Sequence, residues 1–421
     1  MSEQRDGLSR RDFLKGSVVT AAAISLGAGV FTHARAEMIG PNDVINAAFV
    51  GVGAEGSMLL RNGIKVPNVK WVACCDIQPS HLKQGLDIAK GAEGYEDYRK
   101  LLERKDIQAI VSAVPIAVHA PLAIEALKAG KHVLSEKMMA YSIEDARKMA
   151  QTAQKTGLKL QIGHQRRYNP NYQHARKMIQ DGMIGPIQSV EAVWNRNASW
   201  RRPVPKDSTE ELTNWRLYRK SSQGLMAELG SHQIDVVNWM VGEVPSGVVG
   251  IGGLNYWKDG RDILDNVQVI FEYPGGVKMT FQSLTTNQFS GCHEKIMGKN
   301  GTIILSEGAP CMLYKEPKTD EEIWESMAHK TTVDGKTGIV LDASKSPRLS
   351  QAAAQGTAIA ENLKKSPYLL ELEDFFLSIR DGHEPLCSPK VGLETCIAAI
   401  KANEAMDKRR YMEIPAELYK I

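Results

Sequence analysis

The pattern of apolar residues divides the chain into two regions with different periodicities. In the first, short apolar runs at 45–50, 69–76, 107–115, 131–137 and 158–164 alternate with amphipathic stretches, two of which, at 119–130 and 142–157, have helical periodicity. Continuous apolar runs are typical of strands that are buried on both faces, and repeated strand–helix units with short loops predict a doubly wound parallel sheet. We therefore predict an α/β domain over residues 37–160.

The second region has a different pattern. The runs at 247–257, 265–276, 277–286, 292–301 and 302–308 are short, alternate in part, and are separated by glycine turns. This spacing predicts an α+β domain over residues 161–421 with a large, predominantly antiparallel open sheet. Amphipathic helices at 367–382 and 392–408 close the chain, and the polar stretch at about 316–366 is interpreted as an insertion.

The first 36 residues have the layout of an export signal. Arg10 and Arg11 lie in SRRDFLK, residues 18–31 form a mildly apolar run, and residues 34–36 read Ala-Arg-Ala. A basic start, an apolar stretch and a small-residue cleavage site define secretory signals, and the paired arginines mark the twin-arginine route. The run is too short to span a membrane. We expect export by the twin-arginine machinery, cleavage after Ala36, and a periplasmic protein without membrane contact.

Charge and cysteine content narrow the partners and the chemistry. The formal net charge is only +3 over 421 residues, so we expect no nucleic acid partner. The six cysteines have no CxxC spacing. A chain that folds before export forms its core with reduced thiols, so Cys74 and Cys75, in an apolar run, are predicted to be core residues.

A glycine-rich turn follows the first run. Gly51, Gly53 and Gly56 fit the pattern G-x-G-x-x-G between a strand and a helix, where glycines permit a tight turn, the approach of a pyrophosphate and close helix packing. Asp76 ends the second run 20 residues after Gly56, where a carboxylate binds the adenosine ribose and repels a 2′-phosphate. The unit predicts a Rossmann domain that binds NAD rather than NADP. A purely structural glycine turn is the alternative.

Further candidate site residues lie at or just past the ends of the predicted strands. These are Pro115, His119, Glu136, Lys137 and His164. Because the ligands of doubly wound sheets bind beyond the carboxyl ends of the strands, we expect these residues to line one crevice.

Several short motifs occur in a characteristic order. GVGAEG, AVPIAVH, AGKHVLSEK and GHQRRYNP are followed by a helix that contains ELGSHQID. This set resembles the Gfo/Idh/MocA family of sugar and cyclitol oxidoreductases over nearly the whole chain after the signal. The resemblance implies a nicotinamide cofactor, a small-molecule sugar or glycoside as substrate, and a second sheet that forms one wall of the cleft. It also implies a homodimer or homotetramer.

In that family the lysine of an EKP motif lies beside the nicotinamide and assists proton transfer, a role that falls on Lys137 in this chain. A lysine close to a cationic ring holds its proton less tightly, whereas the alternative is an ordinary surface lysine. Met138 replaces the family's proline. A cis peptide bond at this position is therefore not expected.

Three polar residues share the helix with the motif ELGSHQID. Glu228, His232 and Asp235 lie at positions i, i+4 and i+7, which predicts one polar stripe on an α-helix. By resemblance, His232 is the general base or orients a hydroxyl, Asp235 holds its other ring nitrogen, and Glu228 stands where the family has aspartate. A satisfied core histidine is the alternative. We expect no metal, because three ligands on one straight helix spread over two turns.

The segment 191–224 is rich in Trp, Arg and Asn. Such residues either bind a sugar, through aromatic faces and hydroxyl-binding groups, or pin a loop to the core. The residues of interest are Trp194, Arg196, Asn197, Trp200, Arg201, Trp215 and Tyr218.

Motif and resemblance together assign three sets of site residues. The predicted catalytic residues are Lys137, His232 and Glu228. The predicted cofactor ligands are Gly51, Gly53, Ala54, Glu55, Gly56, Asp76, Pro115, His119, Glu136, Lys137 and Arg167. The predicted substrate ligands are Lys137, His164, Arg166, Trp200, Trp215, Glu228, His232 and Asp235.

These assignments predict an oxidoreductase that acts on a secondary hydroxyl of a sugar or glycoside. Free NAD is scarce outside the cytoplasm, so we expect a tightly bound cofactor that is recycled in place. The eight residues between Ala36 and Ile45 are too few to wrap around it. A redox-neutral, NAD-dependent glycoside hydrolase that acts through transient C3 oxidation and elimination is one alternative. A non-catalytic NAD- and sugar-binding sensor is another.

Overall fold

The computed structural model describes residues 43–342, apart from 308, 318, 320–324, 326, 327 and 334, and residues 362–421. The predicted signal with its cleavage site, and part of the predicted insertion, lie outside these residues. The chain divides into residues 1–35 and a compact unit of residues 36–421, and both predicted domains belong to the second unit. None of the helices among the described residues has the length and apolarity needed to cross a membrane.

The predicted parallel sheet is confirmed. Within the described residues it has six strands in the order β3-β2-β1-β4-β5-β6, and all neighbours run parallel. The strands are β1 Ile45–Val50, β2 Val69–Cys75, β3 Glu93–Tyr95, β4 Ala109–Ser112, β5 His132–Glu136 and β6 Leu160–Gly163. The helices between them are α2 Ala54–Gly63, α3 Pro79–Ile88, α4 Arg99–Glu103, α5 Ile116–Lys128 and α6 Ile143–Thr156. The chain reverses direction across the sheet between β1 and β4, where such folds bind ligands.

Local sequence explains how these elements begin and end. Ser142 caps α6 by accepting a hydrogen bond from the backbone N–H of Asp145, and Gly157 ends the helix with a φ of +69°. Cys74 and Cys75 are buried in β2, as predicted. Strand β6 continues to Gly163, so the first sheet extends slightly past the domain boundary predicted at 160.

The second sheet is mostly antiparallel, as predicted. In the described residues it has ten strands in the order β14-β15-β13-β12-β11-β7-β10-β9-β8-β16, and β7 and β10 are parallel. The strands are β7 Ile187–Asn197, β8 Gly247–Gly253, β9 Asn266–Glu272, β10 Lys278–Leu284, β11 Thr286–Gly298, β12 Gly301–Leu305, β13 Cys311–Lys315, β14 Lys330–Val333, β15 Lys336–Leu341 and β16 Met412–Glu413. The described part of the predicted insertion thus supplies edge strands to this sheet.

The remaining helical segments connect or cover the two sheets. They are η1 Gln165–Tyr168, α7 Pro170–Gln180, α8 Glu210–Thr213, η2 Trp215–Leu217, η3 Met226–Gly230, α9 Ser231–Val241, α13 Pro367–Asp381, α14 Pro389–Lys408 and η5 Ala416–Tyr419. Helix α14 packs against α6 beside the first sheet and against α9 and β8 in the second region.

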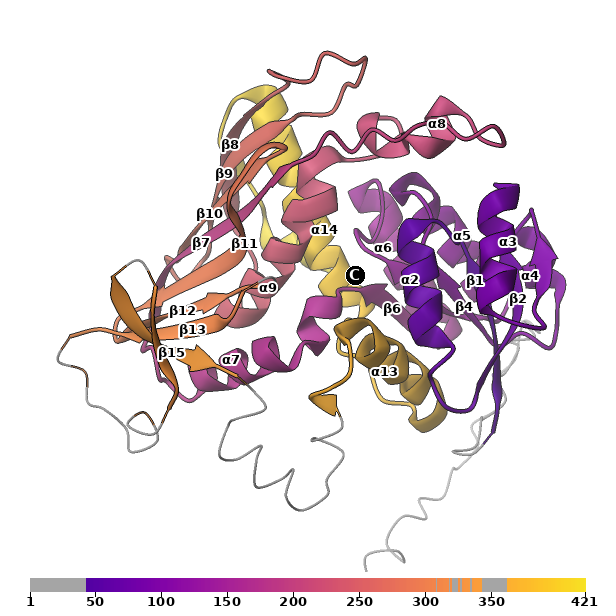
Figure 1. Ribbon diagram of the computed structural model, residues 1–421, viewed down its shortest axis with the longest axis horizontal. Helices are drawn as coiled ribbons and strands as arrows, with labels where there is room; N and C mark the ends of the chain where they lie inside the picture. The colour runs from indigo at the N-terminus through magenta and orange to yellow at the C-terminus, as the bar shows by residue number, and fades with distance from the viewer. Residues whose placement is uncertain are drawn as a thin grey trace, which may run out of the picture. The chain divides into compact units, whose positions relative to one another are not determined.

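Helix α13 completes the core of the first sheet, although it lies near the end of the chain. Phe375 and Phe376 are buried in the same cluster as Phe49 and Trp71, and the rings of Trp71 and Phe376 lie 5.9 Å apart. Figure 1 shows α13 beside α2. The C-terminal part of the chain therefore returns to the first sheet, which the assignment of residues 161–421 to one domain did not foresee.

Candidate active site

The glycine turn between β1 and α2 has no room for side chains at two of its three glycines. Gly51 has a φ of +85°, and a Cβ there would lie 2.5 Å from the carbonyl oxygen of Ala113. A Cβ at Gly56 would lie 1.8 Å from the carbonyl oxygen of Gly51. At Gly53, in contrast, the nearest atom to a Cβ belongs to His81, 3.6 Å away. The fold requires the first and third glycines, whereas the second leaves a space that fits the approach of a pyrophosphate.

Asp76 connects this turn to the second strand. Its Oδ2 accepts a hydrogen bond from the Val52 N–H at 2.7 Å, and its Oδ1 accepts one from the Gln78 N–H at 2.8 Å. A carboxylate has about four acceptor sites, so both oxygens can still receive ribose hydroxyls. Ala54 and Glu55 begin α2 immediately after the turn. The cradle therefore has the donors, space and charge that a dinucleotide needs.

Pro115 and His119 lie at the start of α5, beyond the end of β4. Pro115 is the N-cap of the helix, and the His119 ring is buried, with Nδ1 2.8 Å from the Met138 carbonyl oxygen and Nε2 2.8 Å from that of Val114. Burial lowers the pKa of His119. The described contacts of the ring are thus with two backbone carbonyl groups, one in the segment after β4 and one in the loop after Lys137.

The peptide bond between Lys137 and Met138 is cis. The expectation drawn from the absence of proline was therefore wrong. The Met138 carbonyl that follows this bond is held by His119, a contact made by residues far apart in the sequence.

Lys137 links the first sheet to the second region. It follows β5, and its Nζ donates a hydrogen bond to the Glu228 carbonyl oxygen at 2.8 Å. Burial lowers the pKa of Lys137, against the opposing effect of Glu228 and Glu136. The neighbouring Glu136 is buried, and burial together with the charge of Glu55 raises its pKa to about 8. A half-buried amine and a largely protonated carboxyl group thus lie side by side at this strand end.

The predicted stripe of Glu228, His232 and Asp235 does not lie on one regular α-helix. Residues 226–230 form a π-helix, and α9 begins only at Ser231. The wider turn changes the angular offset between Glu228 and His232, which α-helical spacing cannot describe. Such π-helical turns are frequent at functional sites.

Glu228 is paired from its own side of the cleft. Its Oε2 accepts a hydrogen bond from Arg216 Nε at 3.0 Å, and its Oε1 accepts one from Ser222 Oγ at 3.3 Å. The Arg216 guanidinium in turn lies 4.3 Å from the centre of the Trp215 ring. Trp215 therefore supports the partner of Glu228.

His232 and Asp235 have separate surroundings, contrary to the expectation that Asp235 holds His232. Asp235 binds Arg167, with its two oxygens 2.9 and 3.0 Å from Arg167 Nε. It also lies 3.9 Å from Nδ1 of His164, a buried imidazole whose pKa falls to about 4 because of burial. The physical reason is that Arg167, which belongs to η1, lies against the face of α9 that carries Asp235 and binds its carboxylate.

The His232 imidazole is buried, which disfavours its charged form. Burial lowers its pKa well below the ordinary value, and the charges of Lys137, Arg166 and Arg196 act in the same direction. Its ring lies 5.3 Å from that of Trp194, and its Nδ1 has no hydrogen-bond partner among the residues that the structure describes. It can therefore accept a proton or a hydroxyl hydrogen bond.

Arg166 is completely buried between the two sides of the second region. Its guanidinium donates to Glu294 Oε1 at 2.6 Å and to Glu307 Oε2 at 3.0 Å, and it lies 4.8 Å from the centre of the Trp194 ring. Cys292 Sγ is 3.2 Å from the same group. Arg166, a predicted substrate ligand, thus lies against the Trp194 ring, and its described polar contacts are with other protein side chains.

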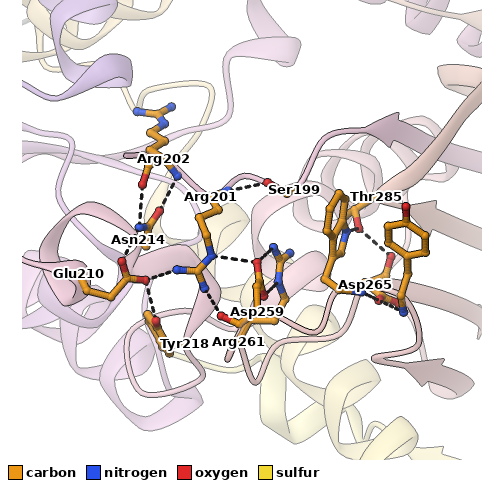
Figure 2. Close-up of polar contacts among 12 residues, drawn as sticks. Ser199, Arg201, Arg202, Glu210, Asn214, Tyr218, Asp259, Arg261, Asp265 and Thr285 are labelled. Atoms are coloured by element: carbon orange, nitrogen blue, oxygen red, sulfur yellow. Dashed lines mark hydrogen bonds and ion pairs between the residues drawn. The ribbon is translucent and has the colours of Figure 1, made fainter. Parts of the chain in front are cut away.

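The residues 198–214, which we call the strap, leave β7 and return to the rest of the second region through a network of ion pairs. Figure 2 shows that Arg201 binds both Glu210 and Asp259, the latter with Nε at 2.9 Å from Oδ2. Arg261 donates to the same Asp259 oxygen at 2.6 Å, and Tyr218 donates to Glu210 at 2.7 Å. Arg201 and Tyr218, noted in the sequence as possible sugar ligands, thus fix the base of the strap.

The far part of the strap reaches the first sheet. Asp207 Oδ2 accepts a hydrogen bond from the backbone N–H of Ser80, in the first turn of α3, at 2.9 Å. Ser80 lies four residues after Asp76, at the adenosine side of the dinucleotide cradle. Trp200, at the other end of the strap, lies beside Arg196 near the predicted substrate residues. The strap therefore reaches from Arg196 to the start of α3, beside the dinucleotide cradle.

The structure separates the predicted residues into a cofactor side, built on the turn after β1 and the end of β5, and a substrate side around Trp194. Arg167 joins the substrate side through Asp235 rather than the glycine turn. Sequence reasoning missed the partners that organise the substrate side: Arg216, Glu294, Glu307 and Cys292. No local motif marks them, because each meets its partner through folding.

Comparisons with known proteins agree with this architecture. Residues 45–164 match the oxidoreductase family with an NAD-binding Rossmann fold, and residues 172–304 match the Gfo/Idh/MocA C-terminal domain. Residues 7–27 match the twin-arginine translocation pathway signal sequence. The chain belongs to the Gfo/Idh/MocA oxidoreductase family, and its first domain is of the NAD-binding type.

Relatives with printed activities act on small polyols or sugars. An inositol 2-dehydrogenase from Rubrobacter xylanophilus is 29% identical over 63% of this chain and 72% of its own length. A glycosyl hydrolase family 109 protein from Shewanella pealeana is 27% identical over 50% of each chain. The chain spans about half the length of most of the curated relatives it matches, for example 54% and 55% of two of them. A levoglucosan dehydrogenase in complex with NADH and L-sorbose has the same fold, with a TM-score of 0.73 and 18% identity over 89% of this chain and 99% of the other.

Proposed function

We propose that the protein is an exported, NAD-dependent oxidoreductase that acts on a secondary hydroxyl of a sugar or glycoside. The observation that carries the proposal is the meeting of Lys137 with the helix of His232. The Lys137 Nζ contacts the carbonyl oxygen of Glu228, which lies four residues before His232. Burial favours the uncharged form of both side chains. An uncharged amine or imidazole can take the proton of a hydroxyl group as its carbon is oxidised.

The cofactor side fits NAD in particular. Gly51, Gly53 and Gly56 would hold the pyrophosphate, and Asp76 would bind the adenosine ribose and disfavour a 2′-phosphate. Bound NAD would supply the hydride acceptor. Lys137 or His232 holds the hydroxyl proton, while Glu228, fixed by Arg216, orients a neighbouring hydroxyl. The activities printed for the inositol and levoglucosan dehydrogenases support a substrate of this class.

We further propose that the protein carries its cofactor through export and recycles it in place, in the periplasm and after cleavage behind Ala36. The strap supports this proposal, because it extends from Trp200 at the substrate side to Ser80 beside the adenosine side. A segment that spans both ends of a bound dinucleotide hinders its escape. The match to a twin-arginine signal supports folding before transport.

Cofactor retention can be measured without any substrate. The exported protein is purified without added nucleotide and denatured, and the released nucleotide is identified and counted by mass spectrometry. We expect near-stoichiometric NAD(H), and several-fold less in Asp207→Ala, which loses the contact with Ser80. Glu211→Ala is the matched control, since Glu211 lies on the strap but pairs with Lys220 at the surface. An empty wild-type protein, or equal loss in both variants, contradicts retention by the strap.

A redox-neutral glycoside hydrolase is the second candidate, supported by the relative of glycosyl hydrolase family 109. In this reaction a hydride leaves C3 of the sugar, the neighbouring C–H loses its proton, and the aglycone departs by elimination. Water then adds and the hydride returns, so no external oxidant is consumed. Lys137 and His232 would hold the protons in both candidates.

Aryl glycosides separate these candidates from each other and from a sensor. Release of aryl alcohol without an added acceptor and without net NADH supports the hydrolase. A stable keto-sugar formed with a reduced acceptor supports the oxidoreductase. A sensor would bind sugar with no turnover, and every activity would be the same in Lys137→Met.

We also propose that the protein assembles as a homodimer or homotetramer through the second sheet. Val249 on β8 and Ile270 on β9 are paired across the outer face of the sheet, and Ile251 is 75% exposed there. Light scattering measures the mass, and Ile251→Lys should lower it, whereas Leu377→Lys on α13 should not.

A further inference from the structure

Arg196 lies on the substrate side and has no carboxylate partner among the residues that the structure describes. It lies on β7, and its guanidinium carbon is 5.4 Å from the centre of the Trp194 ring and 5.2 Å from that of Trp200. No hydrogen bond or ion pair joins its guanidinium to any residue that the structure describes. The side chain is half-buried, so the group is held between two indoles yet stays accessible.

The other arginines of the substrate side differ in this respect. Arg166 is neutralised by Glu294 and Glu307, Arg167 by Asp235, and Arg216 by Glu228. Each of these three guanidinium groups therefore forms at least one ion pair with a carboxylate. Arg196 remains as the arginine of this group that forms no ion pair with a described carboxylate.

Arg196 shares a neighbouring ring with His232. The Trp194 ring that covers Arg196 also lies 5.3 Å from the His232 ring. Trp200 has a φ of +63°, a backbone conformation that costs free energy in a tryptophan and that clusters at ligand sites. The strained residue places its indole against the guanidinium. The two indoles thus fix the orientation of Arg196, and one of them, Trp194, also lies beside His232.

We propose that the substrate is a sugar that bears a carboxylate and that Arg196 binds this carboxylate. The proposal rests on the proposed function and narrows its substrate class to sugar acids or their glycosides. The planar guanidinium matches a carboxylate through two parallel hydrogen bonds, and the flanking indoles exclude water from them. One uncompensated guanidinium provides for one negative charge, which a carboxylate carries and a phosphate monoester exceeds.

The burial of Arg196 also favours the binding of an anion. It lowers the pKa of the guanidinium, because the loss of solvation outweighs the opposing effect of Glu228. A bound carboxylate restores the missing interaction. A neutral sugar cannot do so, although it can stack on the same indoles.

Matched sugar pairs test the proposal. The probes are D-glucuronate with D-glucose and D-galacturonate with D-galactose, and binding to the holoprotein is followed by tryptophan fluorescence and calorimetry. Because a charge-assisted hydrogen bond is worth about 1.5–3 kcal/mol, each acid should bind roughly tenfold to a hundredfold more tightly than its neutral counterpart. The preference should decrease as salt is raised.

Substitutions then test whether Arg196 is responsible for the preference for the acid. Arg196→Gln should abolish it, and Arg196→Lys should retain part of it, since the charge stays but the fork is lost. Arg202→Gln is the control, because this exposed side chain belongs to the same segment. Melting temperatures establish that each variant is folded. Preference for the acid in Arg196→Gln, or its absence in the wild-type protein, overturns the proposal, as does tighter binding of glucose 6-phosphate than of glucuronate.

Measuring turnover as well as binding distinguishes a failure of this proposal from a failure of the proposed function. If glucuronate binds through Arg196 but neither substrate is oxidised or cleaved, the carboxylate site stands and the proposed function fails. If glucose and glucuronate bind and react equally, the proposed function stands and the carboxylate site fails.

Discussion

The cofactor side and the substrate side are held together by different kinds of contact. On the cofactor side the contacts are with backbone: Asp76 binds the amides of Val52 and Gln78, and the glycine turn packs against carbonyl oxygens. On the substrate side they are between charged side chains, such as Arg166 with Glu294, 128 residues apart. Backbone conformation is set locally, whereas ion pairs need the whole fold. The first side therefore depends mainly on local sequence, while the second depends on contacts between distant segments.

Lys137 joins these two sides, so its replacement has the largest expected effect. Lys137→Met removes the amine that reaches the Glu228 carbonyl oxygen, and a missing proton-transfer group typically lowers the rate about 10²–10⁴-fold. Cofactor content should fall far less than the rate, because the glycine turn and Asp76 are intact. Single-turnover kinetics of the oxidised holoprotein give the rate, and mass spectrometry gives the nucleotide.

The result also decides which side performs the proton transfer. If Lys137→Met keeps its rate while His232→Gln loses it, the cofactor side contributes binding alone. If both lose rate by similar factors, the two residues act as a unit. Because burial lowers the pKa of Lys137, the wild-type rate should rise with pH up to a plateau, and this limb should be absent in Lys137→Met.

The second-largest effect is expected for the buried ion pair of the substrate side. Arg166→Met leaves Glu294 without its cation, and breaking a buried pair costs about 3–5 kcal/mol of unfolding free energy. Burial already raises the pKa of Glu294 to about 7, so the lone carboxyl should be protonated at neutral pH. Urea unfolding measures the loss.

A neighbouring pair on the same strand is the control for this prediction. Lys295 binds Glu191 at 2.6 Å on the partly exposed side of β11, and exposed pairs contribute about 0–1 kcal/mol. Lys295→Met should therefore have a small effect. The double variant Arg166→Met with Glu294→Leu should recover much of the loss, because no buried charge remains. If Arg166→Met and Lys295→Met lower the unfolding free energy equally, the buried pair is no more important to stability than the exposed pair.

The sequence predicted the cofactor side far better than the substrate side, for the same physical reason. The order of strands, the glycine turn and Asp76 are encoded by residues close together in the chain. The partners of Glu228 and Asp235 were not predictable, because Arg216 and Arg167 reach them from separate segments. The π-helix at 226–230 was also missed, since hydrophobic periodicity does not distinguish it from an α-helix.

Local pattern likewise could not assign α13 to its place. Phe375 and Phe376 show that the helix has an apolar face, but not which sheet that face covers. The cis bond after Lys137 was mispredicted from residue type alone. In the strap, Arg201 and Tyr218 have the composition of a sugar site, yet Glu210 and Asp259 bind them.

A smaller effect is expected from the glycine turn, where two substitutions separate fold from ligand. Gly56→Ala places a Cβ 1.8 Å from the Gly51 carbonyl oxygen, so the helix must shift, at a cost of about 1–3 kcal/mol. Gly53→Ala has room in the protein and should leave the stability of the apoprotein nearly unchanged while weakening NAD binding. Thermal unfolding with and without NAD measures both. If Gly53→Ala destabilises the apoprotein as much as Gly56→Ala, the space at Gly53 is not reserved for a ligand.

The smallest effect is expected at the base of the strap, which connects the two sides. Arg261 and Arg201 hold the pKa of Asp259 well below its usual value. A carboxyl group of this kind stabilises the fold above its unfolded pKa of about 3.9, and the contribution is lost as pH falls through the folded value. Asp259→Asn should therefore cost about 1 kcal/mol at pH 7, and the difference from wild type should shrink below about pH 4. Urea unfolding at pH 7 and pH 3 measures it. If the variant also releases NAD faster, while Asp87→Asn at the exposed pair with Lys83 does not, the ion pairs of the substrate side help to retain the ligand of the cofactor side. If neither variant changes the release rate, the two sides act independently.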